Sequence, residues 1–353
     1  MERRNEEESP SGNKIISVKT RKGTRADIAN HGYVLIFSLW AIVVLGFIAL
    51  SFTRNTTIAI RTEISFTERV KNIYAARGAC IYATQKLLQS KNQEKDEKTS
   101  KNAELKKEKG ADTWRKKRDS RPWMPSNSPY SVRIGDRDCA VLISDESGKI
   151  NVNKITDDMR SSFVRVLTAY KIKELVAETI TDSILDWLDE DDFHHISGAE
   201  KDFYVTLSDP YEPKNGPFES LEELTLVKGV TPEIFDLIRD HLTIYGSGKV
   251  NVNFASKEVL LYVPTITEKI ANAIIQVRKV RGNIKKLSTL KAIFRHFGVI
   301  GKDYEEAMKY VTLDRSDYIM VNSIASSGKI KSGYRLLVLK GVGSCKILAV
   351  YPE

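Results

Sequence analysis

The side chains best suited to chemistry in this 353-residue chain form an acidic cluster. Five carboxylates fall within seven residues, at Asp186, Asp189, Glu190, Asp191 and Asp192, and Glu200 follows after a loop. Carboxylates at this density repel one another unless a hard cation or basic groups lie between them. The spacing differs from that of an EF-hand, because no glycine stands at the sixth loop position. A cation site and a solvated acidic helix end are therefore both open.

Nitrogen and sulfur ligands are scarce in the chain. His194 and His195 lie beside the acidic cluster and would suit a transition metal such as zinc, but oxygen donors outnumber them. The three cysteines form no CxxC pair, and they leave open both a disulfide between Cys139 and Cys345 and buried free thiols. No catalytic triad, HExxH motif or cofactor fingerprint is legible, so we expect no enzyme.

The first structural element predicted along the chain is a membrane-spanning helix. Tyr33–Thr53 holds no charged residue over 21 positions, enough to cross a bilayer core of about 30 Å. Basic residues dominate the segment before it, which predicts a cytoplasmic N-terminus and a single pass. Apolar residues then recur at helical spacing, for example at Ile60, Ile64, Tyr74 and Ile81. We expect residues 33–90 to form one helix whose second half packs on a soluble domain.

The remaining chain divides by pattern into a linker, a sheet and a helical domain. Residues 91–130 are charged and nearly devoid of apolar residues, which predicts a solvated linker. Residues 131–153 and 312–353 alternate with period two and predict strands. Residues 154–311 between them are mostly helical in pattern. The expected fold is therefore α+β, an antiparallel sheet with a large inserted all-α domain.

The inserted region contains an internal repeat. Gly148–Asn153 and Gly248–Asn253 match in five of six residues at a separation of 100. We expect both to be structural turns, with Asn153 and Asn253 as N-caps of the following helices.

Two segments of the same region, Leu224–Phe235 and Val263–Ala271, have the pattern of a helix-hairpin-helix, a module that binds DNA phosphate. A membrane-anchored DNA-binding or DNA-uptake protein is therefore the alternative function. Against it, Thr265 stands where the second hairpin needs glycine. The net charge of +9 also resides mostly in residues 1–31 and 91–121, which contribute +2 and +5.

The N-terminal residues carry a family resemblance. A charged leader ending in Gly32, an apolar helix starting at Tyr33 and the segment Tyr74–Gly78 resemble type IV pilin-like subunits, which prepilin peptidase cuts after that glycine and which are N-methylated. The fifth mature position, glutamate in most such subunits, is Phe37.

Residues 186–224 make the resemblance more specific. The pattern DWLDEDD, then GAE, Tyr204, Tyr211 and Ser220–Leu224 resembles the K-type minor pseudopilins of type II secretion systems, also called general secretion pathway protein K. The resemblance implies a pilin-like sheet with a helix-hairpin-helix-like, or SAM-like, insertion. It also implies calcium, with Asp189, Asp191, Asp192 and Glu200 as ligands.

The same resemblance implies a role and a location. It implies a subunit of the bacterial inner membrane whose bulk is periplasmic, which caps the pseudopilus tip and helps to initiate its assembly. Its implied partners are the I-type and J-type minor pseudopilins, the major pseudopilin, prepilin peptidase and inner membrane lipid, with nucleic acid not expected.

Overall fold

The computed structural model describes residues 25–99, 123–126, 128–341 and 344–352. They fall into two units, one ending at Phe66 and the other starting at Thr67. In the first unit, residues Tyr33 onward belong to a helix that is long and apolar enough to cross a membrane. This helix, α1, spans Arg25–Thr99 without a break. The first residues of the predicted linker are therefore helical, and most of the remaining linker lies outside the described residues.

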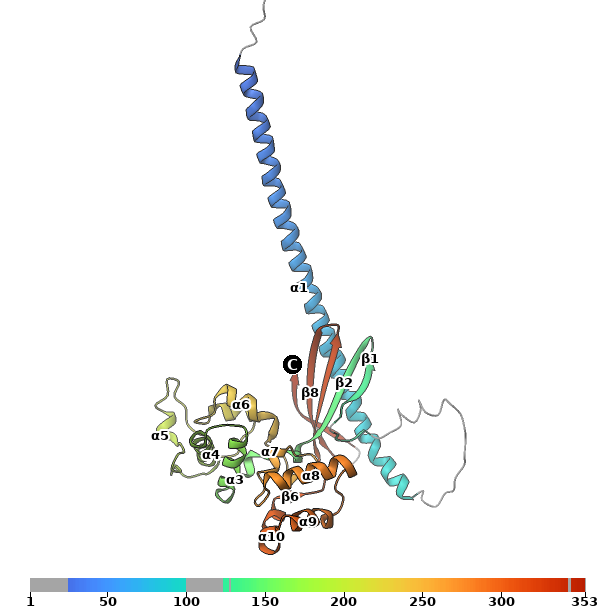
Figure 1. The fold of residues 1–353 in the computed structure, drawn as a ribbon, viewed down its shortest axis with the longest axis vertical. Helices are drawn as coiled ribbons and strands as arrows, with labels where there is room; N and C mark the ends of the chain where they lie inside the picture. Colours follow the sequence, from blue (N-terminus) through green and yellow to red (C-terminus); the bar gives the residue numbers. More distant parts are fainter. Residues whose placement is uncertain (1–24, 100–122, 127, 342–343, 353) are drawn as a thin grey trace, which may run out of the picture. The chain divides into compact units, whose positions relative to one another are not determined.

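A five-stranded antiparallel sheet is the centre of the second unit (Figure 1). Its strands lie in the order β1-β2-β7-β8-β9. They span Tyr130–Ile134, Arg137–Asp145, Tyr318–Ser327, Ile330–Lys340 and Cys345–Pro352. Most of the two groups of strands expected from period-two alternation thus forms one sheet, as predicted. Ile150–Asn151 was expected in the same sheet but pairs with Leu242–Thr243 outside it.

The face of α1 that packs on this sheet consists of small residues. Ala76, Ala79, Cys80 and Ala83 are fully buried against the sheet core, and Leu87 closes the contact. The large residues expected to pack there are exposed, among them Tyr74 and Ile81, so that part of the prediction is wrong. Small side chains allow the helix backbone to approach the strands closely. The Cys80 thiol, for example, donates to the carbonyl oxygen of Tyr334 at 3.2 Å.

The helical insertion leaves the sheet after β2 and returns before β7. Its main helices are α3 (Arg160–Ala169), α4 (Glu174–Leu188), α6 (Pro232–Ile238), α8 (Glu268–Arg281), α9 (Leu287–His296) and α10 (Gly301–Lys309). Shorter turns are η1 (Glu146–Gly148), η2 (Val152–Lys154), η3 (Asp157–Met159), α5 (Lys201–Tyr204), η4 (Leu221–Leu226), η5 (Arg239–His241) and α7 (Lys257–Leu260). Figure 1 shows them grouped together, and their apolar faces share one core.

Two short parallel strand pairs tie the insertion together. Strand β3 (Ile150–Asn151) pairs with β4 (Leu242–Thr243), and β5 (Val250–Asn251) pairs with β6 (Val311–Thr312). Both ends of the insertion therefore lie beyond the expected limits of 154 and 311. The sequence repeat thus corresponds to a structural repeat, two half-domains that each begin with a strand and end with its partner.

The repeated asparagines bind backbone groups of distant residues and do not cap the following helices. The Asn153 side chain accepts from the Phe218 N–H at 2.8 Å and donates to the Phe218 carbonyl at 2.9 Å. Asn253 binds both backbone groups of Ile284 in the same way, at 2.7 and 3.0 Å. The residues that cap η3 and α7 are Thr156 and Ser256 instead. The prediction of Asn153 and Asn253 as N-caps is therefore wrong.

The sheet order also settles the state of the cysteines. Cys139 lies on β2 and Cys345 on β9, three strands apart, which at about 4.8 Å per strand is beyond the reach of a disulfide. All three cysteines are free, and Cys80 and Cys139 are buried.

Candidate functional site

The acidic cluster is built on one face of α4. Asp182, Asp186 and Asp189 follow one another at spacings of four and three, so a single helical face presents them together. Asp182 and Asp186 are fully buried, and Asp189 is the C-cap residue. Arg160 neutralises Asp182 through two bonds, from Nε at 2.5 Å and from Nη2 at 2.9 Å. Among the described residues, no Lys or Arg pairs with Asp186 or Asp189, and the basic group beside Asp186 is His195.

The loop after α4 folds back over this face. The His195 N–H donates to Asp186 Oδ1 at 3.0 Å, and the Ser197 N–H donates to Asp182 Oδ2 at 3.1 Å. The two ring nitrogens of His195 contact Asp186 and Asp157, the latter at 2.8 Å. These contacts return the chain so that Glu200, which is 2% exposed, lies under the same face.

Several oxygen atoms in this cluster are buried without a hydrogen-bond donor among the described residues. They are Asp186 Oδ2, Asp189 Oδ1, both carboxylate oxygens of Glu200 and Asn215 Oδ1. A Cβ at Gly198 would lie 1.9 Å from Asp186 Oδ2, so only glycine fits there. Buried unpaired carboxylates are costly, which indicates that these atoms face a missing partner.

The pKa values of the cluster also show that its buried carboxylates are poorly neutralised. Burial, together with the charges of Asp191 and Asp186, raises the pKa of Asp189 to about 6. Burial and the charges of Asp186 and Asp189 raise the pKa of Glu200 to about 7. Burial opposes protonation of His195, but its contacts with Asp186 and Asp157 outweigh this and raise its pKa. A bound cation would reverse the two carboxylate shifts.

The structure distributes the predicted ligands unevenly. Asp189 and Glu200 belong to the buried cluster, whereas Asp191 and Asp192 are exposed on the loop. Asp191 Oδ1 accepts from the Phe193 N–H at 2.8 Å. Asp186 was not predicted as a ligand, although its position three residues before Asp189 on a helix places it on the same face. Ligand atoms of Asp186, Asp189 and His195 lie within 4.8 Å of one another.

The donor set fits a hard cation better than zinc. The buried unpaired atoms are all carboxylate or amide oxygens, which calcium prefers. Both nitrogens of the His195 ring are already engaged by aspartates, and His194 is exposed with Nδ1 next to the His195 carbonyl. The residues present therefore fit calcium, with Asp186 and Asn215 as further oxygen donors.

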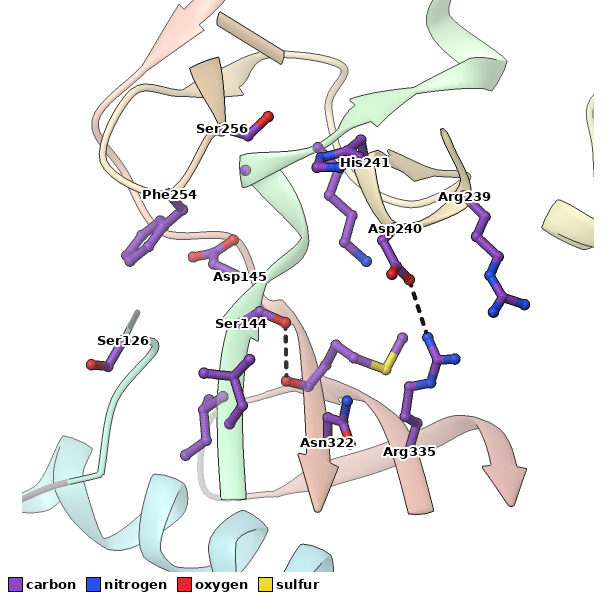
Figure 2. Close-up of a pocket in the computed structure, with 15 residues that line it drawn as sticks. Ser126, Ser144, Asp145, Arg239, Asp240, His241, Phe254, Ser256, Asn322 and Arg335 are labelled. Atoms are coloured by element: carbon purple, nitrogen blue, oxygen red, sulfur yellow. Dashed lines mark hydrogen bonds and ion pairs between the residues drawn. The ribbon is translucent and has the colours of Figure 1, made fainter. Parts of the chain in front are cut away.

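A separate cleft of about 540 Å³ lies where the insertion meets the sheet (Figure 2). Asp240 of η5 forms an ion pair with Arg335 of β8 at 3.3 Å and joins the two parts. Two polar residues of this cleft have structural roles. Asp145 accepts from the N–H groups of Ser147 and Ser316, and Ser256 caps α7.

The two predicted hairpins differ in their turns. Gly229 has a φ of +87°, a conformation that glycine adopts freely. Thr265 holds the corresponding turn of the second hairpin at a φ of +66°, which a β-branched residue rarely adopts. The second hairpin thus keeps the backbone shape but places a side chain where close phosphate approach needs none.

The first half-domain, which carries the acidic cluster, is similar to known proteins. Residues 148–247, the first half-domain, match the family model for type II secretion system protein K. Type II secretion system protein K of Pseudomonas aeruginosa is 25% identical over 225 residues, which cover 59% of this chain and 67% of that protein. Over these residues the chain is similar to type II secretion system protein K. Its relative in Pectobacterium carotovorum is 31% identical over 105 residues, 26% of this chain and about a third of that protein.

Further matches concern the second half-domain and the fold. Residues 246–310 match a helix-hairpin-helix motif, so the two models meet at the boundary between the half-domains. A chain in the crystal structure of the GspK-GspI-GspJ complex from enterotoxigenic Escherichia coli matches with a TM-score of 0.55 and 14% identity. The match covers 84% of this chain and 99% of that chain. The two proteins therefore share a fold.

Proposed function

We propose that this chain is a minor pseudopilin that caps the tip of a type II secretion pseudopilus and helps to start its assembly. The observation that carries the proposal is the large helical insertion between β2 and β7 of a pilin-like sheet. An insertion of this size would be too wide to lie along a packed fibre, whereas the tip leaves room for it. The I-type and J-type minor pseudopilins are the proposed neighbours, since GspI and GspJ form a complex with GspK in Escherichia coli.

The membrane helix supports a terminal position. A carboxylate in lipid is costly unless it is paired, and the glutamate of most pilin-like subunits pairs with the amino terminus of a neighbour. A subunit with no neighbour above it has no such partner. Phe37 at this position therefore fits the tip. The proposed orientation places the leader in the cytoplasm and the second unit in the periplasm.

We propose calcium as the cation of the acidic cluster. Asp189 and Glu200 would bind it, with Asp186 and Asn215 supplying further oxygens, and Asp191 and Asp192 lie on the loop beside them. The bound ion would neutralise the buried carboxylates and hold the loop of residues 189–199 on α4. The proposed role of the metal is structural, because it would fix the surface of the first half-domain.

Processing of the leader tests the proposal directly. Expressed with an active prepilin peptidase, the full chain should give a mature protein that starts at Tyr33 and copurifies with I-type and J-type subunits. A Gly32→Arg variant should keep its leader. Gly46→Ala is the matched control, because a Cβ at Gly46 meets no atom within 4 Å, and it should be cleaved normally. An uncleaved wild-type chain would make α1 an ordinary anchor and would refute the pseudopilin proposal.

A further inference from the structure

The two half-domains of the insertion carry opposite charge. Residues 148–247 contain 10 Lys or Arg and 20 Asp or Glu, a net charge of −10. Residues 248–310 contain 12 Lys or Arg and 5 Asp or Glu, a net charge of +7. The near-neutral average of the folded chain therefore conceals a strongly basic half-domain.

The basic charge is concentrated on α8, α9 and the loop between them. Residues 269–302 include nine Lys or Arg and no acidic residue. One of the nine, Arg278, is used internally, since its Nη1 donates to the Val252 carbonyl at 2.8 Å. Lys279, Arg281, Lys285 and Lys286 are exposed. We call these four residues, with Val280 and Leu287, the basic corner.

Apolar side chains protrude between these cations. Val280 is 80% exposed and has Lys279 and Arg281 as chain neighbours. Leu287 is 55% exposed and directly follows Lys285 and Lys286. Cationic residues interleaved with exposed apolar ones are typical of surfaces that bind anionic lipid, where the charge attracts headgroups and the apolar side chains enter the interface.

The loop that carries the basic corner is fixed by contacts with the rest of the half-domain. Ile284, in the middle of the loop, is buried, and the side chain of Asn253 binds both its N–H and its carbonyl. Helices α8 and α9 also pack on each other. The cations and apolar side chains on either side of Ile284 are therefore presented from a fixed loop rather than from a free one.

The geometry does not favour the DNA-binding mode of a helix-hairpin-helix. In that mode phosphate approaches the hairpin at the N-terminus of the second helix, here the start of α8. That end carries Thr265 in place of glycine, and Glu268, which pairs with Lys257 at 2.9 Å. The basic corner lies at the opposite end of this 14-residue helix, about 20 Å away.

We propose that the basic corner is a docking surface for anionic phospholipid. The proposal goes beyond the pseudopilus role and does not depend on it. Lysine and arginine would attract the headgroups, while Val280 and Leu287 would insert at the interface. The acidic half-domain next to it would be repelled by the same surface, so the insertion would approach a bilayer with its second half-domain first.

Vesicle capture by the full chain tests this surface. The protein is reconstituted through its own helix in phosphatidylcholine nanodiscs and mixed with vesicles of phosphatidylcholine alone or with about a third phosphatidylglycerol. Only the phosphatidylglycerol vesicles should be captured, and high salt should release them.

A triple Lys→Gln variant at Lys279, Lys285 and Lys286 should lower the affinity by about a hundredfold. The matched control changes Lys154, Lys171 and Lys173, exposed lysines of the acidic half-domain, to Gln and should bind as wild type.

Two further measurements separate lipid from other anionic partners. A Val280→Ser, Leu287→Ser double variant keeps the charge and should still lose affinity for the vesicles, because insertion is lost. Thermal unfolding of each variant shows whether its fold is intact. Equal capture by the triple variant and its control would refute the proposal. So would a wild-type chain that shifts a DNA duplex but captures no vesicles, since this would assign the corner to nucleic acid.

Discussion

Glu200 and Asp186 are the residues on which the proposed cation site most depends. Both are buried with unpaired carboxylate oxygens, and Asp186 Oδ2 lies so close to Gly198 that a Cβ there would clash with it. Such an arrangement costs stability without a counter-ion, because burial disfavours the charged form. The nearby arginine, Arg160, pairs with Asp182, and His195 is the basic residue that contacts Asp186. This uncompensated burial is the reason why we propose a cation at the cluster.

Removal of the proposed ligands should abolish a calcium effect on stability. Calcium in excess should raise the melting temperature of the wild-type protein by about 5 °C or more, since an ion that binds only the folded state stabilises it. Asp189→Ala and Glu200→Ala should show no such rise. Differential scanning calorimetry in calcium and in chelator measures the difference.

Asp209→Ala is the control for this experiment, because Asp209 is an exposed acid of the same half-domain outside the cluster. It should retain the full response to calcium. Equal melting curves of the wild type with calcium and with chelator would contradict the metal proposal. A response to zinc but not to calcium would instead indicate a transition metal bound through His195.

At the scale of elements, the same structural arrangement occurs in both half-domains of the insertion. Each half-domain begins with a strand that pairs in parallel with its last strand, and an asparagine after the first strand binds both backbone groups of a distant residue. Asn153 holds Phe218 in this way and Asn253 holds Ile284. The two bonds satisfy backbone groups that no regular element pairs, which explains why the side chain is an amide.

Truncation of either asparagine should therefore destabilise the fold. Asn153→Ala and Asn253→Ala should each lower the free energy of unfolding by about 1–3 kcal/mol, because each leaves buried backbone groups without partners. Denaturant unfolding monitored by circular dichroism measures this loss. Asn283→Ala, at an exposed position in the loop next to Ile284, should change it by less than about 0.5 kcal/mol. An equal loss of unfolding free energy in Asn283→Ala would show that the two side-chain hydrogen bonds of Asn153 and Asn253 do not stabilise the fold.

At the scale of the whole molecule, one ion pair joins the helix to the sheet. Glu68 of α1 accepts from Arg137 at 2.6 Å and from the Ser327 hydroxyl at 2.6 Å, so it connects the helix to β2 and β7. The hydrogen bonds from Arg137 and Ser327 lower the pKa of Glu68 to about 2. A lowered pKa means that the ionised carboxylate favours the folded state.

This contact predicts a defined acid sensitivity. The stabilisation by Glu68 should be complete above about pH 4.5 and should fade as the pH falls toward 2. A Glu68→Gln variant should lack that part of the pH dependence, as measured by thermal unfolding across this range. Glu63→Gln, at an exposed position on the same helix, should follow the wild-type curve. Parallel curves for wild type and Glu68→Gln would show that the pair does not stabilise the fold.

Local patterns in the sequence determined the elements of this protein. Twenty-one uncharged residues predict a helix long enough to cross a membrane, period-two alternation predicts strands, and helical spacing predicts the insertion between them. The acidic cluster and the separate repeat that contains Asn153 and Asn253 are also visible in the sequence. These features depend on neighbours in the sequence, so they can be read without knowing which distant segments meet.

The tertiary structure decided what depends on distant segments. It chose the alanine face of α1 over Tyr74 and Ile81, because close approach to the sheet favours small side chains. It separated Cys139 from Cys345 by strand order, and it buried Asp186 and Glu200 together through a loop that no local pattern specifies. Strand pairing and loop closure join residues far apart in sequence, and that long-range geometry has no local periodic signature.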